Sequence, residues 1–228
     1  MLYNVVVNDW DEITYVPTTL GNVLLAVVII AFLAAALFLA GKKTKNPKGG
    51  RTKLTVKQLV FCAMSLALGT VLSNLKLYDM PWGGSVTLLS KLVICLPGYW
   101  FGLGAGLLTG VAHGFLQLLI EPYVLFPLQL LIDYPLAFGA LGLSGLFSNS
   151  KYGLIKGYLV GVIGYWVFAV ISGAAFFGAY AWDGWAPLPY SMAYNGSYVF
   201  AEAALTLVLL AIPAVNKTFA RVKKLALE

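Results

Sequence analysis

The sequence contains one long aromatic stretch, Tyr180-Ala-Trp-Asp-Gly-Trp-Ala-Pro-Leu-Pro-Tyr190-Ser-Met-Ala-Tyr194-Asn195, between two long apolar segments. Gly184, Pro187 and Pro189 argue against a continuous helix here, because proline lacks an amide N–H and biases the residue before it to extended geometry. We therefore predict a loop. Its Trp and Tyr side chains suit the aromatic belt of a membrane protein. A whole loop of them also suits a lid over a flat organic ligand.

The composition around this loop indicates an all-α integral membrane protein. Sixty per cent of the residues are hydrophobic and 11% are charged, and several apolar runs are long enough to cross a bilayer. Cys62 and Cys95 lie inside apolar runs, so we expect neither a disulfide framework nor a metal site. The chain has one histidine and no Walker A, HExxH or GxSxG motif. We therefore expect no enzyme activity and no cofactor.

The distribution of charge indicates the topology. Residues 1–19 carry acidic but no basic side chains, whereas the apolar run Leu20 to Ala40 is followed by seven basic residues between Lys42 and Lys57. We therefore predict an extracellular N-terminus and an extra transmembrane helix within residues 1–41, then a basic cytoplasmic linker over 42–54.

The rest of the chain predicts a six-helix membrane domain over residues 55–217 and a cytoplasmic tail over 218–228. The six spans are expected near 55–75, 87–100, 102–120, 124–147, 154–179 and 195–216. This arrangement puts thirteen of the fifteen basic residues on or near the cytoplasmic side, as the positive-inside rule favours. The net charge of +6 therefore reflects topology, and we expect no nucleic-acid partner. The outer connections would be 77–86, 121–123 and the aromatic loop.

Three charged residues fall within the predicted spans, where charge is costly and indicates function. They are Lys91, Asp133 and Glu202. Asp133 would lie roughly 14 Å below the outer surface at a rise of 1.5 Å per residue, and Pro135 would kink its helix. A carboxylate at this depth needs a cation, donors or a proton. Asp133 could therefore contact a cationic ligand or pair with Lys91, and Glu202 could instead pair with Lys91.

Two further polar residues have two readings each. Asn195 stands where the aromatic loop is expected to enter the last span, so it could cap that helix, contact a ligand, or both. His113 lies among glycines, and a lone histidine in such a place is more often packed and hydrogen-bonded than catalytic.

Four segments together carry a family resemblance: Met80-Pro-Trp-Gly-Gly-Ser-Val-Thr87, Leu131-Ile-Asp-Tyr-Pro-Leu-Ala-Phe138, Tyr180-Ala-Trp-Asp-Gly-Trp and Tyr190-Ser-Met-Ala-Tyr-Asn-Gly196. They resemble the thiamin-specific S components of energy-coupling-factor transporters. The resemblance covers residues 55–217 and implies a six-helix S-component bundle, to which the extra N-terminal helix is added. It implies a binding subunit that takes thiamin from outside. Its partners would be a shared transmembrane subunit and two ATPase subunits that drive uptake.

The resemblance also implies which residues bind. The implied thiamin contacts are Trp82, His113, Tyr123, Asp133, Tyr134, Phe177, Trp182, Tyr190 and Asn195. It implies that Ala63 and Ala67, a pair of small residues one turn apart, form the face that docks the transmembrane subunit. The sequence departs from some members at Ala169 and Phe177, where a histidine and a stacking tryptophan are known.

Three other readings stay open. The chain could bind another vitamin or a thiamin derivative. It could be an intramembrane enzyme that uses Asp133 and His113, although no catalytic motif supports this. It could also be an autonomous carrier, which would usually need an internal repeat.

Overall fold

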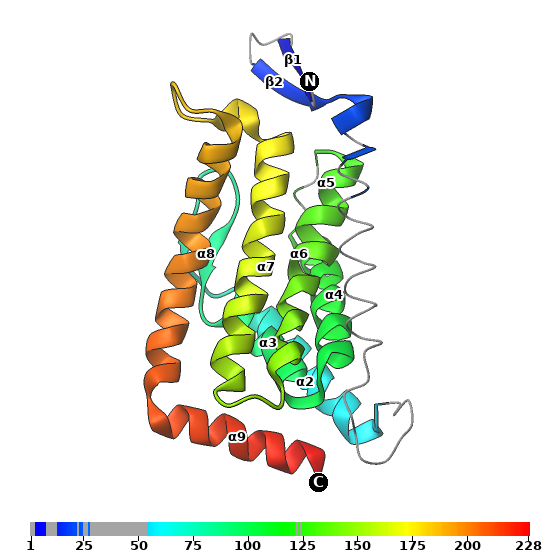
Figure 1. Cartoon of the computed structure of the whole chain (residues 1–228), viewed down its shortest axis with the longest axis vertical. Helices are drawn as coiled ribbons and strands as arrows, with labels where there is room; N and C mark the ends of the chain where they lie inside the picture. The colour runs from blue at the N-terminus through cyan, green and yellow to red at the C-terminus, as the bar shows by residue number, and fades with distance from the viewer. Residues whose placement is uncertain are drawn as a thin grey trace.

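The protein forms a bundle of long helices with a small hairpin at one end and a transverse helix at the other (Figure 1). The computed structural model describes residues 3–7, 13–21, 23, 24, 27, 54–121, 123 and 125–228. The predicted first helix, Leu20 to Ala40, and the basic linker fall largely outside the described residues.

The helices and strands that the structure describes alternate along the chain in irregular order. In chain order they are β1 Tyr3–Val7, β2 Ile13–Pro17, α2 Val56–Ser73, β3 Lys76–Asp79, β4 Ser85–Thr87, α3 Ser90–Phe101, α4 Leu103–Ile120, α5 Pro127–Leu131, the π-helix η1 Ile132–Leu136, α6 Ala137–Ala140, the 3-10 helix η2 Leu141–Phe147, α7 Gly153–Phe176, the 3-10 helix η3 Gly178–Tyr180, α8 Pro187–Ala211 and α9 Pro213–Leu227.

The prediction of a helical membrane bundle is confirmed. Five segments in the described part of the chain are long and apolar enough to span a membrane. They are Val56–Ser73, Leu103–Ile120, Leu128–Phe147, Gly153–Phe176 and Pro187–Ala211. All five coincide with predicted spans, although the bounds of the last differ.

The prediction that residues 87–100 cross the whole membrane is wrong. Helix α3 has twelve residues, which at 1.5 Å per residue is about 18 Å, well short of a hydrocarbon core of roughly 30 Å. The chain before it forms the hairpin β3–β4, which packs against α8. Helix α3 lies in the half of the bundle nearer to α9 (Figure 1). An apolar run of this length does not distinguish a short buried helix from a span.

The fourth predicted span is irregular. It passes from α5 through the π-helix η1 into α6 and the 3-10 helix η2. Pro135 lies inside η1, and because proline has no N–H, the wider turn of a π-helix accommodates it. The segment also approaches α4 closely, since a Cβ on Gly106 would meet the backbone of Gly142 and one on Gly110 the backbone of Phe138. Gly106 and Gly110 therefore allow α4 to pack closely against this segment.

The last predicted span starts and ends too late. Helix α8 begins at Pro187 rather than at Asn195 and ends at Ala211. Pro187 and Pro189 lie in its first turn, where the missing N–H has no helical partner in any case. The non-helical part of the aromatic loop therefore shrinks to about residues 181–186. The predicted tail is the separate helix α9, which runs across the end of the bundle (Figure 1).

Candidate functional site

A cavity of about 630 Å³ opens at the end of the bundle opposite α9. Its walls come from the β3–β4 hairpin, the end of α4, η1, the end of α7 and the first turns of α8. A volume of this size suits a small organic ligand. Seven of the nine predicted contact residues line it, namely Trp82, Tyr123, Asp133, Tyr134, Phe177, Tyr190 and Asn195.

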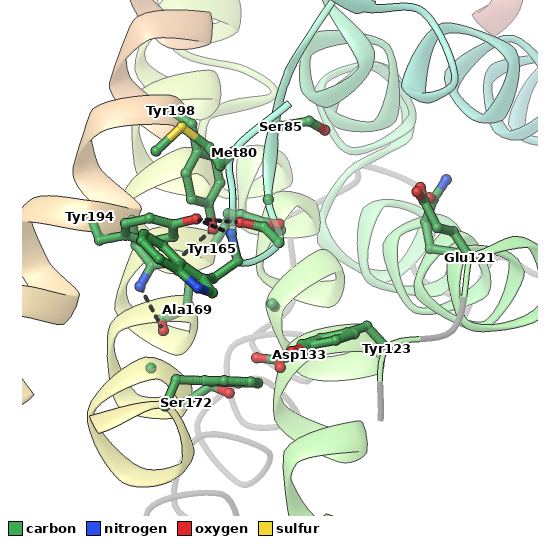
Figure 2. A pocket seen from close by; sticks show the side chains of 18 of the residues that line it. Met80, Ser85, Glu121, Tyr123, Asp133, Tyr165, Ala169, Ser172, Tyr194 and Tyr198 are labelled. Atoms are coloured by element: carbon green, nitrogen blue, oxygen red, sulfur yellow. Dashed lines mark hydrogen bonds between the residues drawn. The ribbon is translucent and has the colours of Figure 1, made fainter. Parts of the chain in front are cut away.

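Asp133 supplies a carboxylate to the cavity from η1. One of its oxygens accepts a hydrogen bond of 2.8 Å from Gln129 Nε2, one turn earlier. Figure 2 shows Asp133 beside Tyr123, with Ser172 of α7 close by. No lysine or arginine in the described part of the chain forms an ion pair with Asp133. The carboxylate is thus left for a donor or cation that enters the cavity.

The predicted alternative, a pair between Asp133 and Lys91, is wrong. Lys91 Nζ lies 2.6 Å from Glu202 Oε2, and both side chains are buried. The Glu202 carboxylate also accepts from the Thr87 hydroxyl at 2.7 Å and from the backbone N–H groups of Thr87 and Lys91 at 3.2 Å. These hydrogen bonds satisfy the remaining carboxylate oxygen sites, as a buried ion pair requires to offset the cost of desolvating both charges. The expectation that Glu202 could pair with Lys91 is confirmed.

The Glu202 pair also fixes the end of α3. Helix α3 has no side-chain cap of its own, and the residue before it, Leu89, is in the left-handed conformation. The Glu202 carboxylate on α8 accepts a hydrogen bond from the backbone N–H of Lys91. It thereby supplies an acceptor for one of the N–H groups that have no partner within the first turn of α3. The pair therefore joins α8 to the base of the β3–β4 hairpin.

Asn195 faces the cavity from inside α8, and its prediction as a helix N-cap is wrong. Its Nδ2 donates to the backbone oxygens of Ala169 and Ser191, at 3.3 and 3.0 Å, and its Oδ1 accepts from the Tyr198 hydroxyl at 2.6 Å. The amide donors are therefore occupied within the protein rather than free. The close approach needs Gly173 on α7, because a Cβ there would lie 2.9 Å from the Asn195 amide nitrogen.

Aromatic rings cover the outer part of the cavity. The rings of Tyr123 and Phe177 are stacked, with centroids 5.8 Å apart and planes 17° apart. Tyr180 lies 6.3 Å from Phe177 and 6.0 Å from Trp82. The rings thus form a continuous arc from the α4–α5 connection to the β3–β4 hairpin, with Tyr190 of α8 deeper in the wall. Such an arc suits a flat ring system with positive charge.

Tyr194 holds the hairpin in place and was missed by the sequence analysis as a contact. Its hydroxyl donates to the carbonyl of Gly83 at 3.0 Å and accepts from the Trp82 N–H at 3.1 Å. The neighbouring Gly84 has φ +84° and faces the Tyr198 ring, where a Cβ would lie 2.7 Å away. The hairpin tip thus fits against α8 only with glycine there.

A charged cluster at the cavity mouth was also missed. Lys76 of β3 lies 2.5 Å from Glu121 at the end of α4 and 3.2 Å from Asp79. The hydrogen bond to Glu121 raises the pKa of Lys76, so the lysine stays charged near neutral pH. All three side chains line the cavity. Their separation in sequence, with Glu121 45 residues after Lys76, gives no signal that they meet.

Two of the predicted contacts do not reach the cavity. His113 is 1% exposed, lies 3.3 Å from the Thr70 hydroxyl and packs edge-on against Phe138. His113 is therefore a packed, hydrogen-bonded residue of the protein interior. It does not lie in the cavity with Asp133, as the hypothesis of an intramembrane enzyme would require. Trp182 packs edge-on against Tyr190, at 5.2 Å, so it contacts a wall residue from outside.

Ala63 and Ala67 do not line this cavity and lie on an exposed face of α2. Only Cys62, Ser65 and Gly69 of this helix are buried. A shallow apolar groove of about 200 Å³ lies beside Ala63, between α2 and α4. The structure thus leaves room for another helix against this face.

Comparisons with known proteins agree with this architecture. The family model described as "Thiamine transporter protein (Thia_YuaJ)" matches residues 59–221. The thiamine transporter ThiT of Bacillus subtilis (strain 168) is 35% identical over 153 residues, which cover 60% of this chain and 79% of the relative. The ThiT of Lacticaseibacillus paracasei is 30% identical over 130 residues, covering 51% of this chain and 63% of that relative.

A solved structure supports the fold as well. ThiT from Listeria monocytogenes superimposes with a TM-score of 0.58 at 26% identity and covers 69% of this chain and 96% of that chain. The relatives are named as transporters, not enzymes. The family model and the structural match agree with each other. The chain belongs to the thiamine transporter family.

Proposed function

We propose that this protein binds thiamin in the cavity around Asp133 and serves as the binding subunit for its uptake. The observation that carries the proposal is the Asp133 carboxylate, which lines the cavity while the nearby lysines are paired elsewhere. Thiamin has a permanently positive thiazolium ring and an aminopyrimidine that donates and accepts hydrogen bonds. A desolvated carboxylate attracts both the cation and an amino group.

The aromatic arc suits the rest of the same ligand. Two flat rings can lie against Tyr123, Phe177 and Trp82, and a cationic ring over an aromatic face contributes about 0.5 to 2 kcal/mol. The relatives named thiamine transporters support this ligand. A neutral ligand would leave Asp133 without a counter-charge, which is costly at this depth.

We further propose that the protein works with a shared transmembrane subunit and two ATPase subunits. The chain carries no nucleotide-binding motif, so the energy for uptake would come from such partners. The exposed Ala63 and Ala67 on α2 supply a face on which a second helix can approach closely. We place the cavity outside the cell and α9 in the cytoplasm, because, in the described chain, the lysines at the start of α7 and the basic residues of α9 lie at the α9 end (Figure 1).

Thiamin binding is tested by titrating the purified protein while following tryptophan fluorescence. Trp82 lines the cavity, so thiamin should quench the signal, and the quenching should be smaller in Trp82→Phe. Thiamin that neither quenches fluorescence nor binds by calorimetry would refute the ligand. Orientation is tested separately by labelling cells from outside with a thiol reagent. Cysteine at Asp183 should react and cysteine at Asn46 should not, and the reverse pattern would refute the orientation.

A further inference from the structure

Helix α9 presents two opposite faces, and only one of them is used inside the protein. Val215, Phe219 and Val222 pack against the core of the bundle, and Ala226 is 2% exposed. These residues recur at the spacing of one helix face. Helix α9 therefore lies with its apolar face on the end of the bundle, beside α2 and α3 (Figure 1).

The other face of α9 is basic. Lys217, Arg221 and Lys224 follow at intervals of four and three residues, so they lie on one face, and all three are exposed. Lys224 lies 3.8 Å from Glu228. Neither Lys217 nor Arg221 forms an ion pair with any residue that the structure describes. This basic face, defined by the three residues, has no anionic partner within the described chain apart from that terminal contact.

The orientation of α9 about its axis is fixed by Lys223. Its ammonium group donates to the backbone carbonyl of Ser148, the residue after η2, and lies 4.4 Å from the centre of the Tyr99 ring of α3. Burial lowers the pKa of Lys223, in agreement with its inward position. Together with Phe219 on the core side, this anchor prevents the helix from rolling. The basic face therefore points away from the bundle, toward water rather than toward lipid beside it.

We propose that the basic face of α9 docks an acidic, water-exposed segment of the partner subunits described above. The proposal rests on the proposed function, since it assigns one contact of the same assembly. Charge complementarity favours an acidic protein surface, because anionic lipid headgroups lie beside the bundle while Lys217 and Arg221 point away from it.

Helix α9 adjoins both the proposed docking face on α2 and the helix α8, which lines the cavity. Helix α9 packs against α2, on which Ala63 and Ala67 are exposed. The apolar face of α2 and the basic face of α9 can therefore meet one partner across the membrane boundary. Helix α9 also follows α8 after a single residue, Ile212. A partner bound at α9 would therefore lie next to the end of the helix that also carries Asn195 to the cavity.

The test compares two double variants that remove the same charge. Lys217→Gln/Arg221→Gln alters the basic face, and Lys151→Gln/Lys156→Gln removes two exposed lysines near the same end of the bundle. Each protein is placed in nanodiscs of zwitterionic lipid and, in parallel, in nanodiscs that contain anionic lipid. Binding of the purified energising module, the transmembrane subunit with its two ATPases, is measured at low and high salt. Thiamin affinity is measured on the same preparations.

We expect the α9 variant to bind the module about three- to tenfold more weakly at low salt, because exposed ion pairs contribute modestly and are screened by salt. The control variant should bind like the wild type, and both should keep wild-type thiamin affinity. Equal module binding by the wild type and the α9 variant would overturn the proposal. So would a loss that appears only with anionic lipid in the discs, since the face would then bind the membrane. If the wild type binds thiamin but no module, the proposed partnership and the α9 contact both fail, while the ligand assignment stands.

Discussion

Replacing Asp133 with asparagine tests the centre of the proposed site. The change keeps the size of the side chain and removes its charge. Asparagine retains an oxygen that can accept the 2.8 Å hydrogen bond from Gln129 Nε2, and Lys91 keeps its partner Glu202. No buried group is therefore left without a partner, and the protein should melt close to the wild-type temperature.

Thiamin affinity should fall substantially in the same variant. Losing a charge-assisted contact in a site shielded from water costs about 1.5 to 3 kcal/mol. The dissociation constant should therefore rise roughly tenfold to more than a hundredfold. Calorimetry and ligand-free melting on one preparation measure both quantities.

Asp79→Asn provides the matched control for Asp133→Asn. Asp79 lines the same cavity but its side chain is 63% exposed at the mouth, where it pairs with Lys76. Because exposed pairs contribute little, this variant should lose only a few-fold in affinity. Unchanged affinity in Asp133→Asn, or an equal loss in both variants, would show that Asp133 does not contact the ligand.

Three further variants test other parts of the structure. Lys91→Met leaves the buried Glu202 carboxylate without its cation, so the free energy of unfolding should fall by about 3 to 5 kcal/mol; wild-type melting would contradict this pair. Tyr194→Phe removes the hydroxyl that holds the β3–β4 hairpin, so thiamin should dissociate up to about tenfold faster in stopped-flow fluorescence; an unchanged rate would refute this positioning. Ala63→Phe with Ala67→Phe should abolish uptake in cells but preserve thiamin affinity in the purified protein; weakened affinity would show internal packing instead.

The sequence predicted the fold where length and hydropathy decide it. The runs that became α2, α4 and α7 were placed within a few residues, because a continuous apolar segment has few alternatives in a bilayer. It failed at α3, whose apolar run looks like a span although the helix is short. The prediction that Pro187 and Pro189 exclude a helix was also wrong. Proline is unfavourable in the interior of a helix but is accommodated in its first turn, where both residues lie.

The site could be predicted where a single residue is unusual for its surroundings in the sequence. A carboxylate within an apolar run identifies Asp133 without any contact information. By contrast, Glu121 and Tyr194 act through partners 45 and 112 residues away, Lys76 and Trp82, and no local pattern indicates such pairs. His113 shows the opposite case: its position among glycines correctly indicated a packed residue, whereas the family resemblance implied a ligand contact. In the structure His113 bonds Thr70 of α2 and packs against Phe138.

The short length of α3 explains why this bundle has a cavity at all. A helix that continued to the outer surface would fill part of the space that the β3–β4 hairpin and the binding chamber now share. The hairpin crosses that space and turns at two glycines of positive φ, Gly83 and Gly84. Residues inserted before Ser90 that extend the helix outward would therefore close the chamber, whereas residues inserted at the hairpin tip would only alter its cover. In this protein, the space available to a ligand depends on the residue at which α3 begins.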